Sequence, residues 1–81
     1  MTDRIIPLDQ LQAGSRGVIT RLSGQPSLRH RLAEMGILRG EVIISERIAP
    51  LGDPTAYLVK GYHLSLRRSE ASHIMVRVSP D

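Results

Sequence analysis

Turn-forming residues divide this chain into short segments, and their spacing constrains the fold more strongly than any other feature of the sequence. Single glycines recur along the whole chain, and Pro50 and Pro54 interrupt it again. Parallel strands must be joined by crossovers of about a dozen residues or more, and only one connection here, between residues 22 and 41, is that long. The spacing therefore predicts consecutive antiparallel strands joined by tight turns.

Apolar and polar residues alternate, in the manner of half-buried strands, in five places. The predicted strands are 15–22, 41–48, the two arms of a hairpin within 49–68, and 73–78. In the hairpin, Tyr57 and Val59 are expected to face inward and Leu58 outward. Residues 42–44 are all apolar, so the second strand is ambiguous: either both of its faces are covered, or a bulge resets the alternation.

The one long connection carries a helix. The stretch "LRHRLAEMG" begins at Leu28, and Leu32 and Met35 follow at i+4 and i+7, the spacing of one helix face. Ser27 is predicted as the N-cap and Gly36 as the left-handed residue that ends the helix. The predicted fold is mainly β, a small antiparallel barrel of about five strands, with this short helix between the first two strands plugging one end.

The length and composition exclude several classes of protein. A chain of 81 residues is expected to be a single domain, 1–81, and only about 60 % of the surface of so short a chain is buried on folding, which leaves little room for a catalytic cleft. The absence of cysteine removes disulfides and thiolate metal sites. No apolar run approaches the roughly 18 residues of a membrane span, so a cytoplasmic protein that is not inserted in a membrane is expected.

The charge permits nucleic-acid binding but does not indicate it. The formal net charge is +3 and the sequence pI is about 10.2. However, eight carboxylates are interspersed with the basic residues, and no block of like charge forms. The two tyrosines, the only aromatic residues, cannot provide a platform on which several bases stack.

No arrangement typical of an enzyme is present. His30, His63 and His73 are widely spaced, and no serine occupies a strand-turn-helix elbow. The glycines fall one to a turn and do not form a dense phosphate-binding loop followed by a helix with lysine. The sequence therefore predicts a protein that is not an enzyme.

One pair of residues has the spacing of metal ligands. His30 and Glu34 lie four residues apart on the predicted helix and could both reach one ion, such as Fe²⁺ or Zn²⁺. Two ligands make an incomplete site, and the neighbouring arginines would repel a cation, so a solvated pair is the favoured interpretation. The alternative is a site shared across a dimer, completed by His63 or His73 of a second chain.

Two basic pairs could form a docking surface. These pairs are Arg29 with Arg31 and Arg67 with Arg68. They serve either as solubilising surface or as a patch for an acidic partner, since such charges mainly set encounter rate and partner choice. The outward-facing Leu58 is a further candidate for the interface.

Three blocks of sequence resemble one known family. "LRHRLAEMGILRG", "APLGDP" and "KGYHLSLRRSEASHIMV" occur in order within residues 28–78. Together they closely resemble the FeoA family, the small accessory proteins of bacterial ferrous iron transport, and "IPLDQLQAGSRGVITRL" resembles the family's first turn and strand more loosely. Arg39 departs from the proline that is frequent after the helix, and Met35 from the usual leucine.

The resemblance implies an SH3-like β-barrel and a non-enzymatic role. The expected partner is the cytoplasmic part of FeoB, a membrane transporter with a GTP-hydrolysing domain, and neither a required cofactor nor a small-molecule substrate is implied. A monomer or weak homodimer is expected. The alternatives are a small basic nucleic-acid-binding barrel and a transition-metal carrier or sensor. The same barrel also occurs as the C-terminal module of iron-dependent repressors, where it follows a DNA-binding domain. The transport accessory is the favoured expectation because no such domain precedes the barrel in this sequence.

Overall fold

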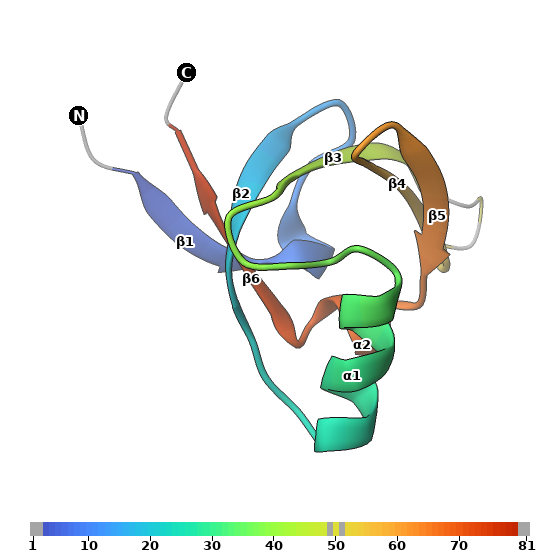
Figure 1. Cartoon of the computed structure of the whole chain (residues 1–81). Coiled ribbons are helices and arrows are strands. Elements are labelled where there is room, and N and C mark those ends of the chain that lie inside the picture. The colour runs from blue at the N-terminus through green and yellow to red at the C-terminus, as the bar shows by residue number, and fades with distance from the viewer. Residues whose placement is uncertain (1–2, 49, 51, 80–81) are drawn as a thin grey trace.

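A computed structural model describes residues 3–48, 50 and 52–79 of the chain as six strands, two α-helices and one 3-10 turn (Figure 1). In chain order these are β1 (Arg4–Pro7), η1 (Leu8–Gln10), β2 (Arg16–Leu22), α1 (Pro26–Glu34), β3 (Val42–Ile48), β4 (Thr55–Val59), β5 (Tyr62–Leu66), α2 (Arg68–Ala71) and β6 (Ile74–Val78). Ala49 and Leu51 of the predicted proline turn lie outside the described residues.

The strands form one antiparallel sheet in the order β1-β6-β2-β3-β4-β5. The prediction of five strands is wrong by one, because Arg4–Pro7 pairs with β6 at the far end of the sequence. The helix α1 therefore lies between the second and third strands. No ladder joins β1 to β5 within the described residues, so the sheet is open and the predicted barrel closure is wrong.

The ambiguous strand β3 keeps its alternation. Ile43 is fully buried, Val42 is 45 % exposed and Ile44 is half-buried. A bulge does occur, but further along, between Ser45 and Arg47 opposite β4. The bulge therefore bends the strand after the apolar run and does not reset the register within it.

A single core fills the concave side of the sheet. The buried apolar residues are Leu8, Leu11, Ile19, Leu32, Ile37, Ile43, Tyr57, Val59, Leu66, Ala71, Ile74 and Val76. The predicted inward positions Tyr57 and Val59 are confirmed, each with 1 % of its surface exposed. Helix α1 contributes Leu32 and covers one end of the sheet, as predicted (Figure 1).

The helix begins earlier than predicted. Pro26 occupies its first turn and Gln25 precedes it, so the prediction of Ser27 as N-cap is wrong. Proline is favoured there because its fixed φ suits the helix and its missing N–H would have no helical partner. The predicted end is confirmed, since Gly36 follows the helix with φ of 91°.

Candidate partner-binding groove

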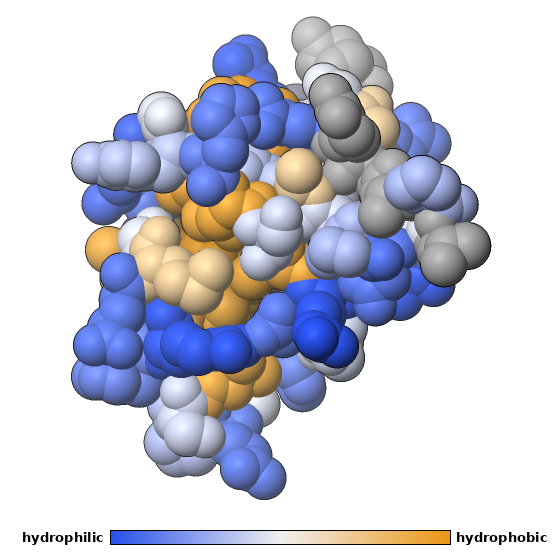
Figure 2. Space-filling model, turned by 90° about the vertical axis from the view of Figure 1, so that its right-hand side faces the viewer, coloured by the Kyte–Doolittle hydropathy of each residue, from blue (hydrophilic) through white to orange (hydrophobic). Residues whose placement is uncertain are grey.

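Three separate stretches of the sequence meet in one groove. It is lined by Arg31 within α1 and Met35 directly after it, Asp53 and Pro54 of the loop before β4, Ser65 of β5, and Arg67 and Glu70 at α2. Figure 2 shows the corresponding side of the molecule, where apolar surface at the centre is surrounded by hydrophilic residues. The groove thus combines the helix block, the proline-turn block and the return-strand block of the sequence.

Glu70 connects the two helices. Its carboxylate forms an ion pair with the Arg31 guanidinium of α1, and its Oε1 accepts a hydrogen bond of 2.9 Å from the backbone N–H of Arg67. The second contact satisfies a backbone donor at the start of α2, the position where an acidic side chain is favourable. Arg31 is therefore engaged within the molecule.

The loop before β4, which contains Asp53 and Pro54, is held to the start of α2. Asp53 Oδ1 accepts a hydrogen bond of 2.9 Å from the backbone N–H of Arg68, and the Asp53–Pro54 peptide is cis. Gly52 has a backbone φ of 87°, a conformation that residues with a side chain rarely adopt. The loop end and the start of α2 thus form one connected unit that lines the groove.

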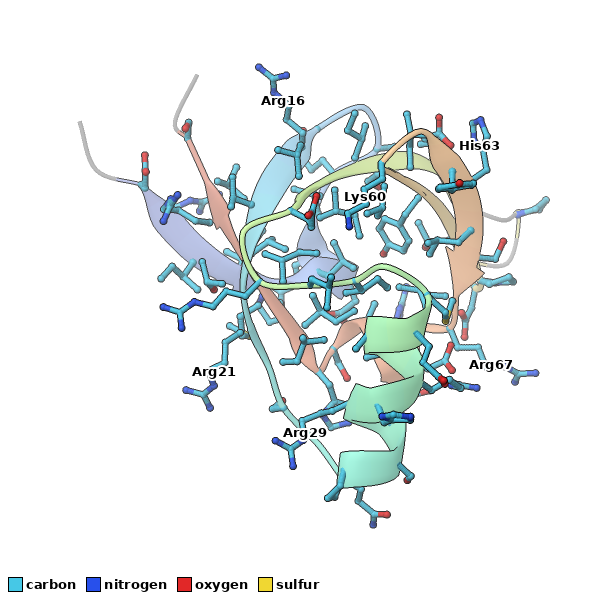
Figure 3. The ribbon with its side chains drawn as sticks, in the orientation of Figure 1. Arg16, Arg21, Arg29, Lys60, His63 and Arg67 are labelled. Atoms are coloured by element: carbon cyan, nitrogen blue, oxygen red, sulfur yellow. The ribbon has the colours of Figure 1, made fainter. Side chains whose placement is uncertain are left out.

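The predicted partner residues fall in two places. Arg31 and Arg67 line the groove, Arg68 adjoins it, and Arg29 is exposed on α1. Arg67 projects away from the molecule (Figure 3). Leu58 does not line the groove.

Leu58 lies on the convex face of the sheet and is half-buried there. Its cross-strand neighbours are Ile44 on β3 and His63 on β5. The predicted outward direction is therefore correct, and the leucine belongs to a separate surface.

The groove is nearly balanced in charge. Two arginines, Arg31 and Arg67, face two carboxylates, Asp53 and Glu70. Met35, the one large apolar side chain among these lining residues, is 37 % exposed. The groove therefore has defined shape and hydrogen-bonding groups but little excess positive charge.

The predicted metal ligands are not brought together in one copy of the chain. His30 Nε2 lies 3.6 Å from Glu34 Oε2, and both side chains are largely exposed. His63 Nδ1 instead contacts Glu46 Oε1 at 2.7 Å, and His73 Nδ1 lies 3.4 Å from Ser23 Oγ. Among the described residues, no three potential ligands cluster. The site shared across a dimer stays a prediction.

The fold changes the ionisation of Tyr57. Burial raises the pKa of Tyr57 above its ordinary value of 10.0, and the negative charges of Asp9 and Asp53 add to this rise. A hydrogen bond with Thr55 and the charge of Arg68 oppose it in part. The phenol therefore stays protonated in the folded protein at neutral pH, in a structural position.

Comparison with known proteins assigns the family. A family model described as the FeoA domain matches residues 6–78. The chain belongs to the FeoA family. A relative from Porphyromonas gingivalis (strain ATCC BAA-308 / W83), the Fe(2+) transport protein A/Fe(2+) transporter FeoB fusion protein, is 39 % identical over 71 residues, covering 88 % of this chain and 8 % of the relative. This FeoA-family chain thus spans a small part of that relative's length.

Solved structures agree with the observed fold. The FeoA-like protein from Clostridium acetobutylicum has a TM-score of 0.88 and 38 % identity, with coverage of 100 % of this chain and 93 % of that one. FeoA of Stenotrophomonas maltophilia, described as a prokaryotic SH3 domain protein complexed with zinc, has a TM-score of 0.75 and 24 % identity, covering 94 % and 89 % of the two chains. The second likeness supports the SH3-like fold.

Sequence patterns did not indicate the residues that organise the groove. Asp53 and Glu70 accept the hydrogen bonds that fix it, yet neither stood out as a candidate. A signal was available for Glu70, because an acidic residue three positions after a helix-start residue is typical of a capped N-terminus. Met35 was assigned to the helix face and not to an exposed surface.

In the described part of the chain, no helix has the length and apolar character to cross a membrane.

Proposed function

We propose that this chain is a non-enzymatic interaction module of ferrous iron transport, which binds the cytoplasmic part of a FeoB-type transporter. The observation that carries the proposal is the 39 % identical relative named as an FeoA/FeoB fusion protein. Joining two partners in one polypeptide raises their effective concentration to the millimolar range. When the two proteins are separate chains, a binding surface must bring them together instead. The module acts on the cytoplasmic side, where the transporter's GTP-hydrolysing domain lies.

The groove and the convex face of the hairpin are the surfaces proposed for this binding. Arg29 and Arg67 are exposed, and the Glu70 and Asp53 contacts hold the groove in shape before any partner arrives. A preformed surface loses less conformational freedom on binding. Arg29, Arg67 and Arg68 would set the encounter rate and orientation, and Leu58 would supply apolar contact.

The proposal is tested by titrating the purified cytoplasmic domain of the transporter with the chain. The double variant Leu58→Asp with Arg68→Glu should bind more weakly, while Tyr62→Ser, at a 74 % exposed position, serves as the control for a surface change elsewhere on the hairpin. The Arg68 substitution leaves its backbone hydrogen bond to Asp53 in place. Absence of binding by the unmodified chain would refute the proposed function.

A metal-carrying role is a second candidate, supported by one contact. The His30 and Glu34 side chains are already close, at 3.6 Å, and a second copy would have to complete the site with His63 or His73. We expect Zn²⁺ or Fe²⁺ to promote dimer formation in analytical ultracentrifugation, and His30→Ala to abolish this effect. Equal metal affinity and oligomeric state in both proteins would exclude a metal site at His30 and Glu34.

A further inference from the structure

Strands β2 and β6 separate where the ladder between them ends, and the sheet has a notch there. Strand β6 pairs with β2 only as far as Arg77 opposite Val18, while it continues along β1 to Val78 opposite Arg4. On its other edge, β2 continues along β3 to Arg16 opposite Ile44. Figure 1 shows the start of β1 and the end of β6 diverging from the start of β2. We call the hollow between them the notch.

The notch has apolar walls and a basic rim. It encloses about 1000 Å³, within the range of sites that hold sizeable ligands. Val18, Val42 and Val78 contribute apolar walls, and Arg4, Arg16 and Arg77 line the rim. Val42 is 45 % exposed and lies opposite Val18, which in turn lies opposite Arg77, so apolar surface adjoins Arg16 and Arg77 on this face of the sheet.

The charge of the notch is unbalanced, in contrast to the groove. No carboxylate is among the described residues that line it. Arg77 Nε lies 3.5 Å from Asp3 Oδ2, but Arg4 and Arg16 form no ion pair within the described part of the chain. Arg16 points outward from the start of β2 (Figure 3). Clustered charge of one sign around an apolar wall attracts a ligand of the opposite sign.

We propose that the notch binds an acidic segment of the transporter's cytoplasmic part, with carboxylates on Arg4 and Arg16 and apolar side chains on Val18 and Val42. This inference rests on the proposed function, which supplies the partner. The exposed Val42 favours a protein segment over a nucleic-acid backbone, because phosphate contacts would use the arginines and leave this apolar surface without a partner.

The test uses charge-matched variants of the full chain against the purified cytoplasmic domain. The notch variant is Arg4→Glu with Arg16→Glu, and the control is Arg21→Glu with Arg39→Glu. Both control arginines are exposed, lie outside the notch and form no ion pair among the described residues. The notch variant should bind at least about tenfold more weakly, and the control should change affinity by less than about threefold. Equal melting temperatures would establish that all the proteins are folded.

A second variant tests the apolar wall without changing charge. Val42→Thr keeps a β-branched residue at the start of β3 and should weaken binding severalfold. The affinity of the unmodified chain should also fall as the salt concentration is raised. This fall should be steeper than for the notch variant, because salt screens the attraction between the partner's carboxylates and the two arginines that the variant lacks.

Each outcome separates the two proposals. If the unmodified chain binds and the notch variant binds equally well, the notch is wrong and the proposed function stands. If the control weakens as much as the notch variant, only overall charge matters and the notch is again wrong. If the unmodified chain does not bind, the proposed function fails and the notch assignment fails with it. A change in self-association of the notch variant, measured by sedimentation, would assign the notch to a second copy and overturn the inference.

Discussion

At the scale of single residues, Ser45 places a polar side chain in the core. Ser45 is fully buried, and its hydroxyl has no hydrogen-bond partner among the described residues. The backbone of Ser45, in contrast, forms two hydrogen bonds: its N–H donates to the Ser15 carbonyl, and its carbonyl accepts from the Gly14 N–H. A buried hydroxyl without a partner carries the cost of its lost hydration.

Ser45→Ala should therefore stabilise the protein. We expect the free energy of unfolding, measured by urea denaturation, to rise by about 1 kcal/mol, because the substitution removes the unpaired hydroxyl and keeps the backbone contacts. The exposed Ser65→Ala is the control and should change stability little. A loss of stability in Ser45→Ala would show that the hydroxyl is paired in solution.

The raised pKa of Tyr57 makes a second prediction at this scale. The folded-state pKa exceeds the unfolded value of 10.0, so the contribution of this phenol is fully present below pH 10 and is lost as pH rises through the folded pKa. Thermal unfolding followed from pH 8 to 11 should show a smaller loss of stability in Tyr57→Phe than in the unmodified chain. Tyr62→Phe, at a 74 % exposed position, should not reduce that loss; the same slope in all three proteins would contradict the account.

At the scale of elements, Glu70 links α1 to α2 by two contacts that can be separated. Glu70→Gln keeps an oxygen for the Arg67 N–H but loses the ion pair with Arg31, while Glu70→Ala loses both. Because Arg31 is more than half exposed, at 56 %, the ion pair should contribute little. We expect Glu70→Ala to lower the free energy of unfolding by about 1 kcal/mol, and Glu70→Gln to lower it by roughly half as much or less.

The comparison for this element is Glu34→Ala. Glu34 is exposed on α1 and contacts only His30 among the ion pairs of the described residues, so its loss should have a small effect. If Glu34→Ala and Glu70→Ala cost the same free energy, Glu70 does not connect the helices in the way its contacts indicate.

Local patterns predicted most of the elements. The i, i+4, i+7 spacing from Leu28 and the glycine at position 36 identified α1, and alternation identified the hairpin arms and β6. Strand β1 was missed because it is only four residues long and ends at Pro7, so its own sequence has almost no period to detect. Its strand character comes from pairing with β6, which is a contact between distant parts of the chain.

The surfaces were less predictable than the elements. The arginine pairs were visible as sequence, but the neutralisation of Arg31 by Glu70 depends on how α1 and α2 pack. The notch was not predicted, since it arises where the β2 and β6 ladder ends, and a register is a property of two strands together. Sequence alone therefore identified charged residues but not which of them lack partners.

At the scale of the whole molecule, two surfaces of different chemistry lie apart. Arg16 and Arg67 mark them, one at the start of β2 and the other beyond β5, and they point in different directions (Figure 3). The groove is shaped and balanced in charge, while the notch is basic and partly apolar. A small module with two such surfaces can hold a partner in one orientation.

Binding of this chain to a FeoB-type transporter, as proposed above, can be tested in cells by tethering the two proteins. Ferrous iron uptake is measured in cells whose own copy of the chain is replaced by the Leu58→Asp, Arg68→Glu variant, supplied either separately or fused to the transporter through a flexible linker. Fusion raises the effective concentration to the millimolar range and should offset weakened binding. We predict low uptake with the separate variant and restored uptake with the fused one. Full uptake with the separate variant despite weakened binding, or no recovery on fusion, would contradict the account.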